Sequence, residues 1–314
     1  MTTAIEVQGL TKQYAGCTVV DDVSFMVEQG EIFGIIGPNG AGKTTTVECI
    51  EGLRSPDSGR ISVLGLNPGR DRAELRERLG VQLQDAELPA RLQVGEALRL
   101  YSSFYAAPRD WRPLMETLGL AAKEKTQFGK LSGGQRQRLS IALALVGQPE
   151  VVVLDELTTG LDPQARRDTW ALMEGVRERG TTIVLVTHFM EEAERLCDRI
   201  AVIDSGRIVA LDTPAALASG AEAGQRIMFR PDRRLDEAEL LALPAVRGVQ
   251  RRGDQVTVTG TGAVLNAVTT LLAGRGIVPC QLRVDQATLE DAFVALTGRH
   301  QDETTGSQES SDVR

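Results

Sequence analysis

The stretch Gly37-Pro38-Asn39-Gly40-Ala41-Gly42-Lys43-Thr44-Thr45 fits the spacing G-x-x-x-x-G-K-[ST] of a phosphate-binding loop. A short apolar run of buried-strand length, Glu31–Ile36, precedes it, and Lys43–Leu53 follows with the pattern of a helix. Glycines allow successive backbone N–H groups to point inward, and the helix start adds partial positive charge. We therefore expect nucleotide binding here, with Lys43 on the β- and γ-phosphates and the Thr44 hydroxyl on Mg²⁺.

The chain of 314 residues has an ordinary globular composition, 42% hydrophobic and 25% charged, with room for two domains. Its net charge of −8 and its pI of about 5.1 leave no chain-wide basic field that would favour a nucleic acid partner. No apolar run approaches the roughly 20 residues that span a bilayer, and the N-terminus lacks the pattern of a secretory signal. The four cysteines are scattered without C-x-x-C spacing, which predicts free thiols in a reducing cytoplasm.

Polar side chains follow two further apolar runs that have the character of strands buried on both faces. Val151–Leu154 precedes Asp155 and Glu156, and Thr181–Val186 ends just before His188. Ligands of open parallel sheets bind outside the carboxyl ends of the strands. Two adjacent carboxylates at that place suit one ligand for Mg²⁺ and one general base. His188 fits either a structural role or a place in the same crevice.

A second candidate anion site lies at Leu131-Ser132-Gly133-Gly134-Gln135, before the helical stretch Arg136–Val146. Ser132 is expected to cap the helix. Gly133 and Gly134 leave backbone N–H groups open at the positive end of the helix dipole, which suits a phosphate. A capped helix start without a ligand is the alternative interpretation.

The local sequence leaves two interpretations open for each of two further residues. Tyr14 lies between the predicted strands Ala4–Val7 and Thr18–Val20, where its ring fits stacking on a purine or a half-buried place in a loop. Gln84 ends the predicted strand Leu79–Gln84, where its side chain fits binding to Mg²⁺ or to the attacking water, or a plain surface role.

The patterns predict a nucleotide-binding domain at 1–220, an accessory domain at 225–299 and a disordered tail at 300–314. Residues 86–148 are mostly helical, and residues 219–226 have the composition of a linker. Aromatic side chains of the helical part are expected in its core: Tyr101, Phe104, Tyr105 and Trp111. Beyond the linker, short strands and helices alternate, which predicts a small α+β fold whose last helix starts at the capping box Thr288-x-x-Asp291.

The order of these motifs resembles that of the ATP-binding-cassette ATPases over roughly residues 4–220. The glycine loop is similar to the Walker A motif of that family, Leu131–Gln135 has the letters of its LSGGQ signature, and Val151–Glu156 looks like its Walker B motif with the catalytic glutamate. Further positions of the resemblance are the Q-loop at Gln84, the D-loop at Gly160-Leu161-Asp162, the switch histidine at His188 and the adenine-stacking position at Tyr14. The family usually has proline where this chain has Leu157, a change that can loosen the following turn but removes no catalytic group.

The resemblance implies an α/β fold: a P-loop NTPase (RecA-like) core with an antiparallel β-subdomain and an α-helical signature subdomain, followed by the small C-terminal α+β domain. It implies hydrolysis of ATP with Mg²⁺. The catalytic residues that it implies are Lys43, Gln84, Glu156 and His188. The Mg²⁺ ligands are Thr44, Gln84 and Asp155. The nucleotide-binding residues are Tyr14, Gly37, Pro38, Asn39, Gly40, Ala41, Gly42, Lys43, Thr44, Thr45, Ser132, Gly133, Gly134, Gln135 and Asp162.

The resemblance also implies a head-to-tail homodimer with two ATP molecules in its interface, because the signature of one copy closes over the γ-phosphate that the other copy holds. A separate integral membrane subunit would dock near Gln84–Ala90, at the cytoplasmic face of the cell membrane. The stretch Asp285–Arg299 is similar to the ending of the ATPase subunits of drug and antibiotic exporters of the daunorubicin-resistance kind. This second likeness implies export of a drug, an antibiotic or another hydrophobic solute.

A soluble cassette ATPase that acts in DNA repair or translation is the alternative. The acidic charge, the single cassette and the lack of a coiled coil between the glycine loop and the signature argue against it. A small-molecule P-loop kinase would not explain the signature. A binding module that never hydrolyses ATP would be expected to lack Lys43 or Glu156, and both are present.

Overall fold

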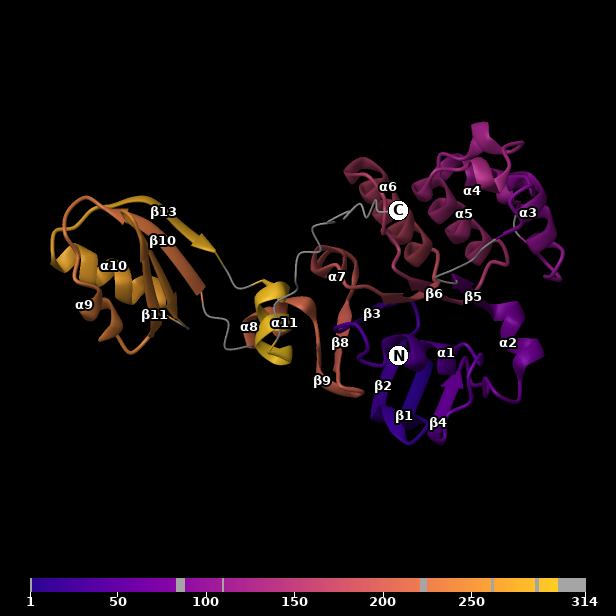
Figure 1. The fold of residues 1–314 in the computed structure, drawn as a ribbon, viewed down its shortest axis with the longest axis horizontal. Helices are drawn as coiled ribbons and strands as arrows, with labels where there is room; N and C mark the ends of the chain where they lie inside the picture. Colours follow the sequence, from indigo (N-terminus) through magenta and orange to yellow (C-terminus); the bar gives the residue numbers. More distant parts are fainter. Residues whose placement is uncertain are drawn as a thin grey trace, which may run out of the picture. The chain divides into compact units, whose positions relative to one another are not determined.

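The structure is a computed structural model, and it describes residues 2–82, 88–108, 110–220, 225–260, 263–285 and 288–298. The chain forms two compact units, which we call the cassette unit (Met1–Leu217) and the accessory unit (Ala218–Arg314) (Figure 1). The expected linker at 219–226 is wrong at both ends. Residues 219 and 220 continue the alanine-rich helix α8 (Pro214–Gly220), and residues 225 and 226 begin strand β10 (Gln225–Pro231). The expected tail at 300–314 lies outside the described residues.

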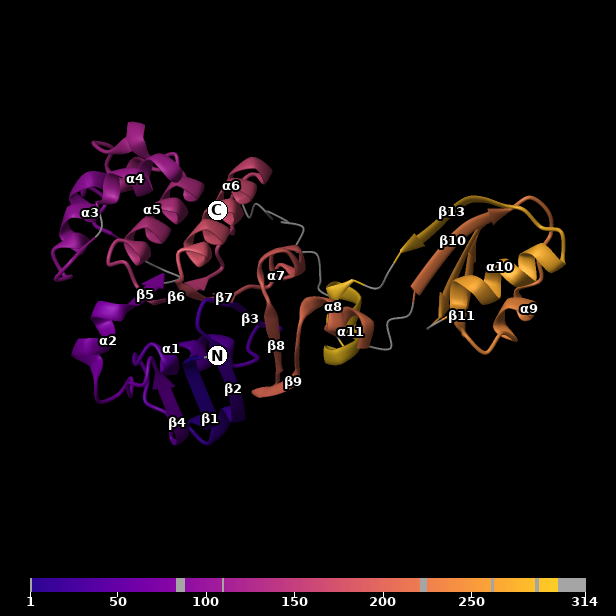
Figure 2. The same cartoon turned by 180° about the vertical axis from the view of Figure 1, so that it is seen from behind.

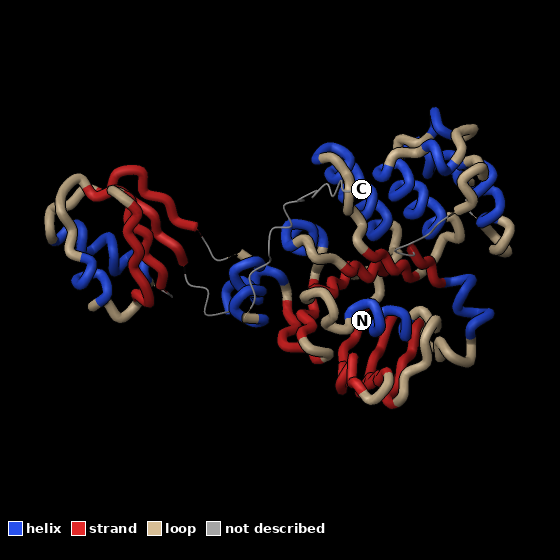
Figure 3. Tube along the Cα trace, viewed as in Figure 1, coloured by secondary structure: helices blue, strands red, loops and turns tan. Residues whose placement is uncertain are grey.

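Six strands form the central sheet of the cassette unit, in the order β5-β6-β7-β3-β8-β9 (Figure 3). Their bounds are β3 (Ile32–Ile36), β5 (Leu79–Gln82), β6 (Val151–Asp155), β7 (Thr182–Val186), β8 (Arg199–Asp204) and β9 (Arg207–Asp212). All neighbours are parallel except β8 and β9, which form a hairpin. Strands β3 and β7 are buried along their whole length, as expected of parallel strands covered on both faces. The carboxyl ends of β3, β6 and β7 therefore meet at one edge of the sheet.

A second, antiparallel sheet has the order β2-β1-β4. Its strands are β1 (Thr3–Tyr14), β2 (Cys17–Glu28) and β4 (Ser58–Val63). The sequence predicted two strands, Thr18–Val20 and Val23–Val27, where the structure has the single strand β2, and this prediction was wrong. Asp22 has a φ of 53°, and the pairing with β1 shifts register there, so the break in the pattern is an irregularity inside one continuous strand.

Helix α1 (Lys43–Ile50) lies between the two sheets (Figure 3). Its buried side chains Val47, Cys49 and Ile50 belong to one apolar core with residues of both sheets. The helix is shorter than the expected Lys43–Leu53, because Gly52 follows it with a φ of 74°, the left-handed conformation in which glycine commonly ends a helix.

Further helices of the cassette unit pack on the central sheet or belong to a helical subdomain (Figure 1). They are α2 (Arg72–Arg78), α3 (Val94–Ser102), α4 (Trp111–Thr117), α5 (Gly133–Leu145), α6 (Pro163–Glu178) and α7 (Met190–Leu196), with short 3₁₀ turns at Ala121–Lys123 and Phe128–Lys130. Helices α3, α4 and α5 gather into a helical subdomain, and α5 and α1 lie on opposite sides of the central sheet (Figures 1 and 2). Trp111 is buried as expected, but Phe104 is 62% exposed, because α3 ends before it.

The accessory unit has the element order of a split β-α-β-β-α-β fold. Its elements are β10 (Gln225–Pro231), α9 (Glu237–Leu241), β11 (Val246–Arg252), β12 (Gln255–Gly260), α10 (Val264–Gly274), β13 (Pro279–Asp285) and α11 (Leu289–Thr297). The sheet order is β11-β12-β10-β13, all antiparallel, and its core joins Phe229, Val258 and Leu272. The sequence missed β11 because its arginines and glycine hide the alternation. The predicted capping box between Thr288 and Asp291 is confirmed.

We predict that a chain ending at Gly220 folds and binds ATP, because the cassette unit and the accessory unit have separate apolar cores. The truncated protein should unfold in one cooperative transition, and its affinity for ATP should stay within about threefold of that of the full chain, a change of less than about 1 kcal/mol. Thermal unfolding and equilibrium ATP binding check this. A truncated chain that is insoluble or does not bind ATP would show that the cassette unit depends on the rest of the chain.

Candidate functional site

The phosphate loop connects β3 to α1, and its backbone requires glycine. A Cβ atom at Gly37 would lie 2.1 Å from the carbonyl oxygen of Ile203, and one at Gly42 would lie 2.5 Å from that of Val19. Gly40 and Gly42 have φ values of 79° and 97°, which L-amino acids rarely adopt. The glycines of the motif are therefore needed for close backbone approach and for the turn, as the sequence predicted.

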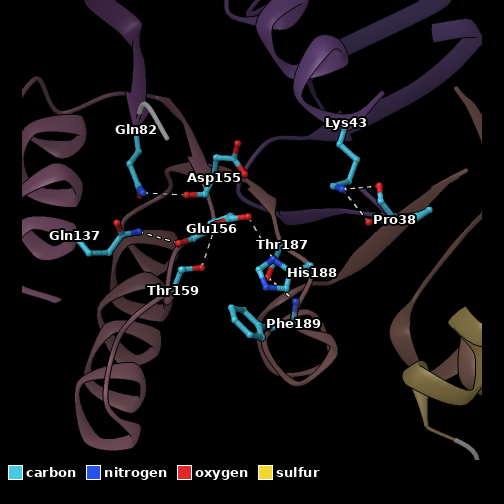
Figure 4. Close-up of polar contacts among 11 residues, drawn as sticks. Pro38, Lys43, Gln82, Gln137, Asp155, Glu156, Thr159, Thr187, His188 and Phe189 are labelled. Atoms are coloured by element: carbon cyan, nitrogen blue, oxygen red, sulfur yellow. Dashed lines mark hydrogen bonds and ion pairs between the residues drawn. The ribbon is translucent and has the colours of Figure 1, made fainter. Parts of the chain in front are cut away.

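Lys43 lies inside this loop. Its Nζ donates hydrogen bonds to the carbonyl oxygens of Gly37 (2.8 Å) and Pro38 (3.0 Å) (Figure 4). Burial lowers the pKa of Lys43, and the charges of Asp155 and Glu156 oppose that change. Burial raises the pKa of Asp155 to about 6, with the charge of Glu156 acting in the same direction and that of Lys43 against it. One cation and two carboxylates thus meet at the carboxyl end of β6.

Glu156 follows β6 in an unusual backbone conformation, with a φ of 51°. Its N–H donates to the carbonyl of Val186 (2.9 Å), which ties it to the end of β7. Its carboxylate lies 3.4 Å from Nδ1 of His188 and accepts a hydrogen bond from the Thr159 hydroxyl at 3.3 Å (Figure 4). The structure therefore brings Glu156 and His188 together, as their positions at the ends of neighbouring parallel strands predicted. No motif in the sequence marks Thr159 as part of the site.

The expected Mg²⁺ site can be compared with the described residues only in part. The Thr44 hydroxyl is exposed at the start of α1, and Asp155 supplies a carboxylate at the end of β6. Hydroxyl and carboxylate oxygens are the ligands that Mg²⁺ prefers, so both fit the ion. Gln84 lies outside the described residues. Gln82, which the sequence analysis passed over, is buried at the end of β5 and donates to the backbone carbonyl of Asp155 at 3.0 Å.

The signature segment starts α5. The N–H of Gln135 donates to the Ser132 hydroxyl (3.3 Å), and the N–H of Ser132 donates to the Gln135 side chain (3.1 Å), so the predicted N-cap is confirmed as a full capping box. Ser132 and Gly133 are exposed, and a Cβ added at Gly133 would meet no atom within 4 Å. The start of this helix is therefore open to solvent, on the side of the central sheet opposite to α1 (Figure 1).

Two further expected site residues have other contacts in the structure. Asp162 caps α6 by accepting hydrogen bonds from the N–H groups of Gln164 (3.0 Å) and Ala165 (2.9 Å). Tyr14, at the end of β1, is 37% exposed. Lys12 and Arg54 place their charged groups 5.5 Å from the centre of its ring. A half-exposed ring beside two cations is compatible with both interpretations of Tyr14, and adenine stacking stays a prediction.

A glycine loop between a buried parallel strand and a helix, with a lysine inside it and carboxylates at the end of a nearby strand, defines a P-loop nucleoside triphosphatase. Residues 20–159 match the family model described as ABC transporter. The chain is 39% identical over 313 residues to Nod factor export ATP-binding protein I of Mesorhizobium japonicum, covering 96% of this chain and 89% of that protein. It is 41% identical over 303 residues to the protein of the same name from Burkholderia orbicola, covering 94% and 97%. The chain belongs to the family of ATP-binding subunits of ABC transporters.

Solved structures agree with this assignment. The structure of an ATP-binding subunit of an ABC transporter is 31% identical, with a TM-score of 0.65, and the match covers 68% of this chain and 92% of that one. A dimeric ATP-binding cassette in a post-hydrolysis state, bound to ADP and Pi, is 25% identical, with a TM-score of 0.60, covering 67% and 98%. These matches confirm the expected fold class, and family membership makes the chain an ATPase.

We predict that Lys43→Ala lowers the ATP hydrolysis rate by at least about 100-fold, because the β- and γ-phosphates lose the fixed side-chain cation of the loop. Phosphate release with Mg²⁺-ATP measures the rate. Lys125→Ala, which removes an exposed lysine of the helical subdomain, is the matched control and should hydrolyse ATP like the wild type. A wild-type rate in Lys43→Ala would mean that the glycine loop is not the phosphate site.

Glu51, at the C-terminal end of α1, has a pKa of about 8, raised first by burial and then by the charges of Glu48 and Asp155. The folded state keeps this proton between pH 4.5, the ordinary pKa, and pH 8, whereas the unfolded chain releases it. The free energy of unfolding therefore falls as pH rises through that window.

We predict that Glu51→Gln removes this loss and gains stability relative to the wild type between about pH 5 and pH 9. The gain should be on the order of 2 kcal/mol, less than the full pKa shift implies because the side chain keeps some contact with solvent. Denaturant unfolding at several pH values measures it, with the exposed Glu178→Gln as the control. A stability difference that does not change with pH would contradict the prediction.

Proposed function

We propose that this chain hydrolyses Mg²⁺-ATP in the interface of two head-to-tail copies and thereby powers export of a solute through a separate membrane subunit. One observation supports an ATP site that is shared between two copies. Lys43, Asp155, Glu156 and His188 converge at the phosphate loop, whereas the capped start of α5 opens on the other side of the central sheet. An open helix start is a ready anion site, so a second copy has to supply the phosphate that it contacts.

The residues of the loop have distinct roles in this proposal. The Lys43 ammonium exchanges the carbonyls of Gly37 and Pro38 for the β- and γ-phosphates, and so stabilises the charge that develops during transfer. Glu156 orients and deprotonates the attacking water, and His188, 3.4 Å from its carboxylate, holds the γ-phosphate side of the site. Mg²⁺, bound by Thr44 and Asp155 and expected also at Gln84, would neutralise phosphate charge.

Transport through another polypeptide is supported by two observations. In the part of the chain that the structure describes, no helix is long and apolar enough to cross a membrane. The helical subdomain instead exposes apolar side chains, with Leu100 46% and Phe104 62% accessible. The docking segment that the sequence predicts, Gln84–Ala90, lies partly outside the described residues. The Tyr101 and Phe104 rings pack at 5.7 Å, which extends this apolar surface. We propose that the membrane subunit binds here, at the cytoplasmic face of the membrane.

The proposed direction of transport and the proposed class of solute are inferred from similarity to other proteins. The two relatives described above are named as export proteins, and their similarity extends over 94% and 96% of this chain. Together with the likeness of Asp285–Arg299 to drug exporters, this supports export of a drug, an antibiotic or another hydrophobic solute. Similarity to exporters over nearly the whole chain does not favour a role in DNA repair or translation.

We predict that Glu156→Gln accumulates an ATP-bound dimer, because it loses the base but keeps Lys43 and Asp155 for binding. Adding Gly133→Asp should abolish that dimer. The new carboxylate would face the phosphate of the other copy, while in its own chain a Cβ there meets no atom within 4 Å and an acid at a helix start is favourable. Size-exclusion chromatography with light scattering in saturating ATP measures the mass.

The control for this prediction is Gly274→Asp, the same change at a helical position in the accessory unit where a Cβ also meets nothing within 4 Å. It should leave the dimer of Glu156→Gln intact. Sedimentation with membranes that contain or lack the membrane subunit tests the transporter role. A chain that binds both membranes equally, or a Glu156→Gln protein that stays monomeric in ATP with the membrane subunit present, would argue against the proposed function.

A further inference from the structure

The signature helix α5 contacts the turn that carries Glu156 in the same chain. Gln137, five positions beyond Ser132, is partly buried in the first half of the helix. Its Nε2 donates to the backbone carbonyls of Glu156 (2.8 Å) and Leu157 (3.1 Å) (Figure 4). One amide group therefore bridges two consecutive carbonyls directly after β6, and neither contact was visible in the sequence.

The turn needs such support because Glu156 has a φ of 51°. A residue with a side chain adopts this left-handed conformation only at a cost, on the order of 1 kcal/mol, that its surroundings must offset. Leu157 makes the conformation accessible, since a proline at that position would push Glu156 toward an extended backbone. The expected loosening of the turn by Leu157 is offset by these contacts: Leu157 is fully buried, and both carbonyls are hydrogen-bonded.

We propose that Gln137 is a positioning residue for Glu156: its amide fixes the backbone that directs the Glu156 carboxylate toward His188. This inference rests on the proposed function, in which Glu156 is the base. Gln137 acts through the turn and contacts no phosphate. Gln137 lies on the same helix as Ser132 and Gly133. When the start of α5 contacts the nucleotide held by a second copy, a displacement of the helix also moves Gln137. That movement reaches Glu156, the base of the same chain. Closure of one site and readiness of the other are thereby linked.

The test uses two variants of the full chain. Gln137→Met keeps the length of the side chain and removes the donor. Its kcat should fall roughly 10- to 100-fold, because a catalytic group is misplaced. Its Kd for ATP should stay within about twofold of the wild-type value. ATP-dependent dimerisation, measured in the Glu156→Gln background with and without Gln137→Met, should also stay within about twofold. Gln250→Met, the same change at an exposed position of β11, is the control and should leave kcat unchanged.

Gln137→Glu separates positioning from a purely structural role. Its carboxylate accepts but does not donate, whereas its protonated form donates one O–H hydrogen bond. The ratio of its kcat to that of the wild type at the same pH should therefore rise as pH falls below neutrality, while the ratio for Gln137→Met stays flat. Glu156 and His188 lie at this turn in all three proteins, and the flat ratio expected for Gln137→Met is the reference for any effect of the introduced carboxyl group.

The failures of the inference and of the proposed function can be told apart. If Gln137→Met hydrolyses ATP like the wild type while Glu156→Gln does not, Gln137 has no positioning role and the proposed function stands. If Glu156→Gln itself keeps the wild-type rate, the proposed function fails. Parallel losses of kcat, ATP affinity and melting temperature in Gln137→Met, with a flat ratio for Gln137→Glu, would show a structural role only and overturn the inference.

Discussion

Lys43 holds a positive charge inside the protein, between two backbone carbonyls and close to the carboxylates of Asp155 and Glu156. Taking an ammonium group out of water is costly unless hydrogen bonds and opposite charges compensate. The loop supplies the carbonyls because its glycines allow close backbone approach, and the parallel sheet supplies the carboxylates because the ends of β3 and β6 lie at one edge. The phosphates of a nucleotide can replace the two carbonyls as partners of the Lys43 ammonium. The need to compensate this buried charge therefore both holds the loop in place and favours nucleotide binding.

This arrangement also explains why one copy is not a complete enzyme in the proposed mechanism. The groups that bind and hydrolyse ATP belong to the edge of the central sheet, whereas the signature belongs to a helix across that sheet. A rigid cassette unit does not bring the exposed start of α5 to its own loop. Gln137, five positions beyond Ser132 in the same helix, connects α5 to the turn after β6 through backbone carbonyls and not through the nucleotide.

The accessory unit separates this chain from ATP-binding cassettes in general. The solved cassettes described above cover 67% and 68% of the chain, whereas the two export relatives cover 94% and 96%. The similarity to the export proteins therefore includes the split β-α-β-β-α-β unit, which has its own apolar core.

The sequence by itself determined the family, the order of the motifs, the capped start of α5 and the meeting of Asp155, Glu156 and His188. These follow from local spacing and from the rule that parallel strands end at one edge. Only the tertiary structure decided the strand β11, the continuity of β2, the left-handed backbone of Glu156, the burial of Glu51 and the contacts of Gln82 and Gln137. The two glutamine contacts depend on partners far apart in the chain: the Gln82 amide meets a carbonyl 73 positions away, and the Gln137 amide meets one 19 positions away. Such contacts form only after packing of the core has brought distant parts of the chain together. The hydrophobic periodicity of the sequence does not indicate which residues will then be neighbours.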